Sequence, residues 1–130
     1  MGTALVTGAT SGIGEEFCWQ LAAAGHDLVL VARREDALRA LAGSLTNVAG
    51  VRAEVIAADL STDAGCARVA ARLDVGGPAD RDKSDLAPVD LLVNNAGFGL
   101  GSAFLDNSLE NEINGLNVMV RAVMTLAHHA

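Results

Sequence analysis

Thr7-Gly8-Ala9-Thr10-Ser11-Gly12-Ile13-Gly14 decides the fold, because it joins a strand-like run at 3–7 to a helix-like run at 13–24. Its glycines follow the spacing GxxxGxG. Glycine allows the sharp bend and the close backbone approach that a phosphate-binding turn requires, and helix N-terminal amides attract anions. The alternative is a glycine-rich connection without a ligand, which the strand-turn-helix context disfavours. The residues we predict to bind nucleotide phosphates are Gly8, Thr10, Ser11, Gly12, Ile13 and Gly14.

Short strand-like runs alternate with Ala/Leu-rich helical runs over the rest of the chain. The run at 27–32 is almost entirely apolar, which is typical of a parallel strand buried on both faces. This alternation predicts an α/β fold, a Rossmann-type doubly wound parallel sheet with right-handed crossovers. The further strands are expected at 52–58 and 89–94, and the further helices at 35–45, from Ser61 or Thr62 to about 73, and from about 107 onward.

Residues 74–88 form the one polar stretch that interrupts this pattern. They carry both prolines and the only lysine, Lys83. We expect a surface loop here, at the sheet edge opposite the ligand.

Composition excludes several classes of protein. The net charge of −7 argues against a nucleic-acid partner, which requires a basic surface. Neither a signal peptide nor a membrane-spanning run is visible, so we expect a cytoplasmic protein. Cys18 and Cys66 are too few for a disulfide framework or a zinc site, so we expect reduced packing residues and no metal.

Arg33 and Arg34 follow the second predicted strand, and Arg33 lies nineteen residues after Gly14. In a dinucleotide-binding fold this position faces the adenosine ribose, where an acidic residue selects NAD. An arginine pairs instead with a 2′-phosphate, so we predict NADP rather than NAD. The alternative is a solvated entry to the next helix.

Two further strand ends carry candidate site residues. Asp59 and Leu60 follow the third predicted strand, where Asp59 can accept a hydrogen bond from an adenine amino group and Leu60 can pack nearby. An ordinary helix cap explains Asp59 as well. Residues 94–97 read Asn-Asn-Ala-Gly after the fourth strand; the small Ala96 and Gly97 permit close approach of a cofactor, although a simple turn also favours these types.

Together, TGxxxGIG, the arginine, Asp-Leu and NNAG resemble the classical short-chain dehydrogenase/reductase family over essentially all 130 residues. The resemblance implies a Rossmann-type fold and hydride transfer between NADP(H) and a small-molecule carbonyl or alcohol. A different doubly wound protein that binds a mononucleotide or a flavin shares the fold, but NNAG and Arg33 count against it.

The same resemblance assigns roles around NNAG and in the last helix. It implies that Asn94 steadies the sheet and that Asn95, Ala96 and Gly97 adjoin the cofactor. It also makes Asn117 the catalytic asparagine, which helps to hold a water in a proton relay. Asn114 is a competing register for this role.

The chain departs from the family in its catalytic set. The family adds a serine, and a tyrosine and lysine in YxxxK, beyond the asparagine helix, whereas this chain has no tyrosine. We therefore expect residues 1–130 to be an incomplete NAD(P)-binding domain, the N-terminal half of a longer enzyme. The alternative is a non-catalytic nucleotide-binding or interaction module.

The apolar pattern of the last helix bears on partners. Leu116, Val120, Val123, Met124 and Ala127 form a stripe that in this family commonly meets a partner subunit, so we expect a homo-oligomer. For the substrate, only Phe98, Leu100 and Ser102 are candidates for contact.

Overall fold

The computed structural model describes residues 2–75 and 87–130, so most of the predicted loop at 74–88 lies outside the described residues. Strands and helices alternate in the order that the sequence predicts. The strands are β1 (Thr3–Thr7), β2 (Asp27–Ala32), β3 (Ala53–Ala57) and β4 (Val89–Val93). The helices are α1 (Gly12–Ala23), α2 (Glu35–Ala49), α3 (Asp63–Leu73), the 3₁₀ turn η1 (Phe104–Asp106), α4 (Leu109–Leu116), the π segment η2 (Asn117–Ala122) and α5 (Val123–His129).

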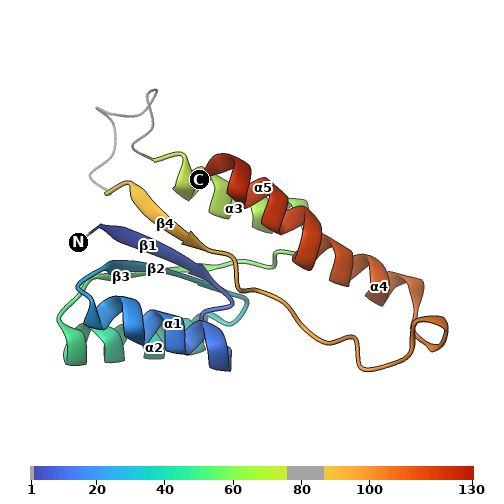
Figure 1. Cartoon of the computed structure of the whole chain (residues 1–130), viewed down its shortest axis with the longest axis horizontal. Coiled ribbons are helices and arrows are strands. Elements are labelled where there is room, and N and C mark those ends of the chain that lie inside the picture. Colours follow the sequence, from blue (N-terminus) through green and yellow to red (C-terminus); the bar gives the residue numbers. More distant parts are fainter. Residues whose placement is uncertain (1, 76–86) are drawn as a thin grey trace.

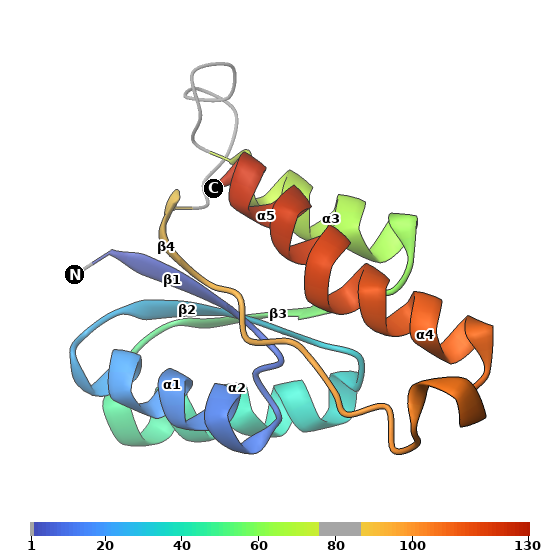
Figure 2. The same ribbon diagram turned by 45° about the vertical axis from the view of Figure 1, so that its right-hand side comes forward.

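The four strands form one parallel sheet in the order β3-β2-β1-β4. Helices α1 and α2 cover one face of the sheet and α3 and α5 cover the other, while α4 extends past the ends of the strands (Figures 1 and 2). The pleat of β1 serves both layers, because Val6 packs toward α1 and α2 while Leu5 packs toward α3 and α5. The doubly wound parallel sheet predicted from the sequence is therefore confirmed.

The helix ends follow local chemistry. Thr62 caps α3 by accepting a hydrogen bond from the Gly65 amide at 3.0 Å. Helix α2 extends four residues beyond the predicted end at Leu45, because Thr46 and Asn47 do not break it and only Gly50, at φ +72°, does. The predicted β3 was one residue too long at each end.

Both cysteines are buried and free. Burial raises the pKa of the Cys18 thiol to about 12, which keeps it protonated and unreactive at neutral pH. The prediction that these residues serve packing is confirmed.

The last helix differs from the single regular helix that we predicted. It begins at Leu109, where Ser108 accepts a hydrogen bond from the Asn111 amide, and it passes through the π segment η2 from Asn117. A π segment holds one extra residue per turn, so it interrupts the 3.6-residue period on which the prediction rested.

Hydrogen bonds lock the carboxyl ends of β1 and β4 together. The buried Thr7 hydroxyl accepts from the backbone amides of Asn95 and Ala96, each at 3.0 Å. The Asn95 side-chain amide donates to the carbonyls of Thr7 and Gly8, each at 3.2 Å. Asn94 donates instead to the Val123 carbonyl of α5 at 3.4 Å. Asn95 therefore joins the two strand ends, and Asn94, which we predicted to steady the sheet, joins the end of β4 to α5.

We expect Thr7→Val to lower the free energy of unfolding by roughly 2–4 kcal/mol, because it leaves two backbone amides without their acceptor. Urea denaturation measures the change. Thr46→Val, at an exposed position of α2, is the matched control and should stay within about 0.5 kcal/mol of wild type. Equal effects of the two substitutions would contradict the role of the Thr7 hydroxyl.

Candidate functional site

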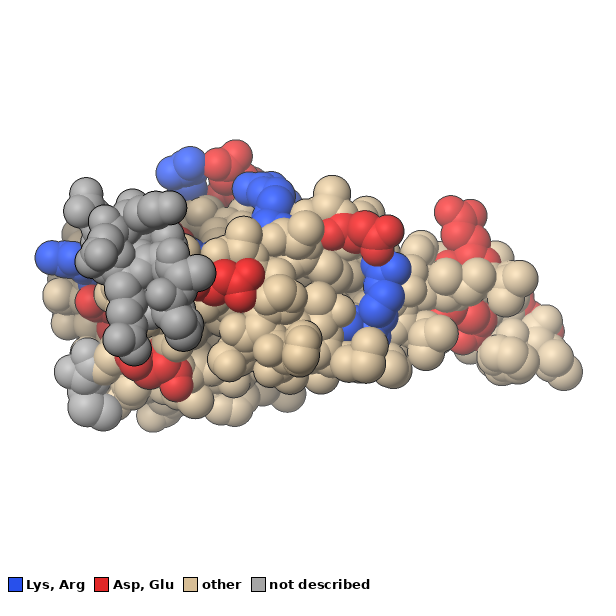
Figure 3. Space-filling view, turned by 90° about the horizontal axis from the view of Figure 1, so that it is seen from above, with Lys and Arg blue, Asp and Glu red and all other residues tan. Residues whose placement is uncertain are grey.

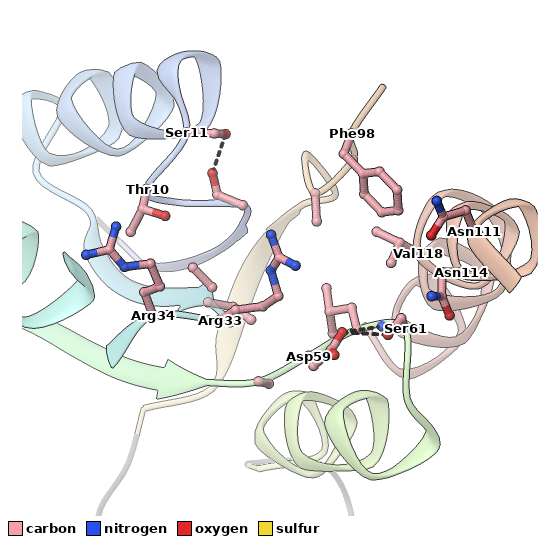
Figure 4. A pocket seen from close by; sticks show the side chains of 17 residues that line it. Thr10, Ser11, Arg33, Arg34, Asp59, Ser61, Phe98, Asn111, Asn114 and Val118 are labelled. Atoms are coloured by element: carbon pink, nitrogen blue, oxygen red, sulfur yellow. Dashed lines mark hydrogen bonds between the residues drawn. The ribbon is translucent and has the colours of Figure 1, made fainter. Parts of the chain in front are cut away.

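A cavity of about 400 Å³ lies at the carboxyl edge of the sheet. This is the edge at which open α/β sheets bind ligands. The cavity is lined both by residues that we predicted to bind the cofactor and by residues that we did not. They are Gly8, Thr10, Ser11, Val31, Ala32, Arg33, Arg34, Ala58, Asp59, Leu60, Ser61, Ala96, Gly97, Phe98, Asn111, Asn114 and Val118. Figure 4 shows the glycine turn on one side of this cavity and the last helix on the other.

The three glycines of the β1–α1 turn serve different purposes. Gly8 adopts φ +64°, a left-handed conformation that L side chains rarely take. Gly14 is buried, and a Cβ there would lie 2.0 Å from the Gly8 carbonyl oxygen, so only glycine lets α1 start this close to the turn. A Cβ on the exposed Gly12 would meet no atom within 4 Å. The protein therefore does not require glycine at position 12 for its own packing.

Ser11 leaves the start of α1 open. It occupies the N-cap position, but its hydroxyl donates back to the Gly8 carbonyl at 2.8 Å and does not cap the helix (Figure 4). Within the described residues, the amides of Gly12, Ile13 and Gly14 thus have no side-chain acceptor. They point with the helix dipole toward incoming negative charge, which is the arrangement that binds phosphate. Gly8, Thr10 and Ser11 line the cavity, whereas Gly12, Ile13 and Gly14 do not.

The two arginines at the end of β2 are in different situations. Arg34 forms an ion pair with Asp36 at 3.0 Å, and this hydrogen bond lowers the pKa of the Asp36 carboxyl. Arg33 also lines the cavity and forms no ion pair with another described residue. Both side chains are exposed, so an anion can reach either guanidinium. Of the two, Arg33 is the arginine without a carboxylate partner among the described residues.

Asp59 is held ionised by the turn that follows β3. The Ser61 hydroxyl donates to its Oδ1 at 2.7 Å and the Ser61 amide to the same atom at 3.0 Å. These bonds stabilise the carboxylate and lower its pKa, against the weaker opposing effect of burial. Among the described residues, Oδ2 keeps its capacity to accept a hydrogen bond. Leu60 is buried beside it and lines the cavity.

Residues of the last helix close the cavity, and sequence reasoning found only part of this wall. Asn114, weighed only as a competing register, lines the cavity together with Asn111 and Val118, which were missed. Asn117 does not line it; its side chain donates to the Ser61 carbonyl at 3.4 Å, at the first residue of the π segment. Such segments are frequent at functional sites.

Figure 3 shows a face on which acidic and basic residues are interspersed and much of the surface is uncharged. Within residues 2–75 and 87–130, no cluster of three or more His, Cys, Asp or Glu side chains could hold a metal ion. In the same ranges, no helix is both long and apolar enough to cross a bilayer.

The comparisons with known proteins identify the family. The model of the family described as short chain dehydrogenase matches residues 2–130. The chain belongs to this family. A short chain dehydrogenase of Pseudocercospora fijiensis is 31% identical over 129 residues, which make up 96% of this chain and 38% of that protein.

Solved short-chain dehydrogenases share the structure as well as the sequence. The enzyme of Sphingobium yanoikuyae, in complex with NADPH, superposes with a TM-score of 0.88 at 36% identity, over 99% of this chain and 46% of that one. The L-sorbose reductase of Gluconobacter frateurii, complexed with NADPH and L-sorbose, superposes with a TM-score of 0.82 at 33% identity. The match covers 98% of this chain and 45% of that one. The chain spans less than half the length of each of these three relatives.

We expect Ser61→Ala to raise the pKa of the Asp59 carboxyl toward its ordinary value, because the Ser61 hydroxyl is the largest cause of its depression. Carboxyl-carbon NMR during a pH titration measures this. Asp36 is the internal control, since its partner Arg34 is untouched. An unchanged Asp59 pKa in the variant would contradict the assignment. With the pKa depressed in the folded state, Asp59 stabilises the fold above the ordinary carboxyl pKa, and this stabilisation is lost as the pH falls through the lowered value.

Proposed function

We propose that this chain is the NADP(H)-binding part of a short-chain dehydrogenase that transfers hydride between the nicotinamide and a small-molecule carbonyl or alcohol. One observation carries the proposal: Ser11, at the uncapped start of α1, and Arg33, which forms no ion pair with another described residue, line one cavity at the carboxyl edge of the sheet. These groups fit the two phosphate positions of NADP(H), the pyrophosphate and the 2′-phosphate. Relatives solved with NADPH support the choice of cofactor.

The cavity lining assigns the parts of the cofactor to residues. The turn from Gly8 to Gly14 would hold the pyrophosphate and Arg33, with Arg34, the 2′-phosphate. Asp59 and Leu60 would hold the adenine. Ala96 and Gly97 would adjoin the nicotinamide side, where their small side chains leave room, and Asn95 would act by holding the backbone of the Gly8 turn.

The bound cofactor supplies or accepts the hydride, and the chain's own residues supply position and proton handling. We assign Asn117 as the residue that holds a water for proton transfer, because the π segment starts there and offers irregular backbone. The family's acid/base tyrosine has no counterpart among these 130 residues. Residues 1–130 would therefore act as an incomplete NAD(P)-binding domain, because they do not contain the whole proton relay. Cytoplasmic location stays part of the proposal.

A second candidate function is a non-catalytic nucleotide-binding or interaction module. The exposed apolar side of the last helix favours it. There Leu116 is 58%, Val120 55% and Met124 65% exposed. Such a surface fits association with a second copy through this helix. The intact mass of the natural gene product, followed by a ketone-reduction assay of that product with NADPH, separates the two. A mass above 13.3 kDa with turnover favours the enzyme, and NADPH binding without turnover by the natural product favours the module.

We expect Arg33→Asp to raise the Kd for NADPH about 10- to 100-fold and to change the Kd for NADH much less, because only NADPH carries the 2′-phosphate. Fluorescence titration with both dinucleotides measures this. Arg39→Asp makes the same charge change on α2 outside the cavity and should not separate the two cofactors. Equal losses for NADPH and NADH in Arg33→Asp would remove the claim of phosphate selection.

Gly12→Ala and Gly14→Ala separate ligand binding from folding. Gly12→Ala should leave the free energy of unfolding within about 0.5 kcal/mol of wild type, because its methyl group meets no protein atom, yet weaken NADPH binding about tenfold or more. Gly14→Ala should instead destabilise the fold by more than about 2 kcal/mol through its clash with Gly8. Calorimetric titration and urea denaturation give the two readouts. Unaltered NADPH binding in Gly12→Ala would count against a pyrophosphate at this turn.

A further inference from the structure

We propose that Asn114 is a specificity-determining residue that reads the purine of the dinucleotide, together with Asp59. The inference rests on the proposed function, since it concerns the base end of the same cavity. It adds to that site a residue of α4 whose side chain supplies what the Asp59 carboxylate cannot, a hydrogen-bond donor.

The position of Asn114 places it at the base end of the cavity. Its half-buried side chain lines the cavity together with Asp59 and Ser61. One helical turn later, Asn117 donates to the Ser61 carbonyl at 3.4 Å, which fixes this helix against the turn after β3. Figure 4 shows Asn114 on the Ser61 side of the cavity, away from Thr10 and Ser11. Because the proposed function assigns the adenine to Asp59 and Leu60, which directly precede Ser61, the base belongs near Asn114.

The side-chain amide of Asn114 is available for a new hydrogen bond, whereas the asparagines near it on the same helix are already bonded. Asn111 donates to the Asn107 side chain at 3.2 Å, and Asn107 donates to Glu112 at the same distance. Asn117 is engaged with Ser61. Within residues 2–75 and 87–130, no hydrogen bond satisfies the side chain of Asn114, although it is half-buried. Its polar atoms are not among the buried ones that lack a partner, so they reach solvent and are open to a ligand.

The chemistry of the two side chains is complementary to adenine. The outer edge of adenine presents an amino group, which donates, beside a ring nitrogen, which accepts. An ionised carboxylate only accepts, whereas an asparagine amide offers both a donor and an acceptor. Asp59 suits the amino group, and the Asn114 NH₂ suits the ring nitrogen. Hypoxanthine reverses this pattern, with an oxygen that accepts beside a ring N–H that donates.

Asn114→Asp tests the assignment, because it keeps the shape of the side chain and removes its donor. The probes are NADPH and reduced nicotinamide hypoxanthine dinucleotide phosphate, and the readout is the Kd of each from fluorescence titration of the full chain. We expect wild type to prefer NADPH, and Asn114→Asp to weaken NADPH at least about fivefold more than the hypoxanthine analogue. The carboxylate has lost its bond to the adenine ring nitrogen but still accepts from the hypoxanthine N–H.

Asn111→Asp is the control for charge, since it adds the same charge one turn earlier on the same wall; it should weaken both probes by the same factor. Asn114→Ala is a second variant and should weaken NADPH about fivefold. Circular dichroism of each variant checks folding. If wild type binds NADPH but Asn114→Asp weakens both probes equally, as Asn111→Asp does, the inference is overturned and the proposed function stands. If wild type binds neither probe, the proposed function fails first.

Discussion

The Thr7 hydroxyl, at the end of β1, is the interaction on which the site depends. It accepts from two consecutive amides after β4, and Asn95 returns hydrogen bonds to the backbone of Thr7 and Gly8. The strand ends and the glycine turn thus form one hydrogen-bonded unit. Gly14 then brings α1 against this unit with no room for a side chain. Because the glycine turn, the small residues after β4 and the start of α1 are fixed to each other, the cavity is formed without a ligand.

The layers of the fold were predictable because each rests on a strong local signal. The apolar run of β2 and the glycine turn after β1 predicted a buried parallel sheet, and the comparisons and the structure confirm it. Helix ends were less predictable where weak helix formers such as Thr46 and Asn47 precede the true stop at Gly50. The predicted loop around Lys83 lies outside the described residues.

The candidate site was predictable along the sheet edge and not along the helix that faces it. Residues after parallel strands must meet at one edge, so Arg33, Asp59 and Ala96 could be placed together from sequence order alone. Which asparagine of NNAG joins the strands and which joins the sheet to a helix depends on strand register and twist, and the pattern did not predict these partners. The cavity-lining side of α4 depends on how the helix is rotated about its axis, which the π segment changes.

The π segment between α4 and α5 also limits how the length of this helix can vary. One extra residue in a turn rotates everything after it by about 100° relative to a regular helix. The residues before the segment serve the cavity, and those after it, such as Ala122 and Leu126, pack in the core with α3. Deletion of a single residue here would therefore bring either Asn114 or Leu126 to the wrong side of the helix. Substitutions can accumulate along such a helix, whereas insertions and deletions are confined to its ends.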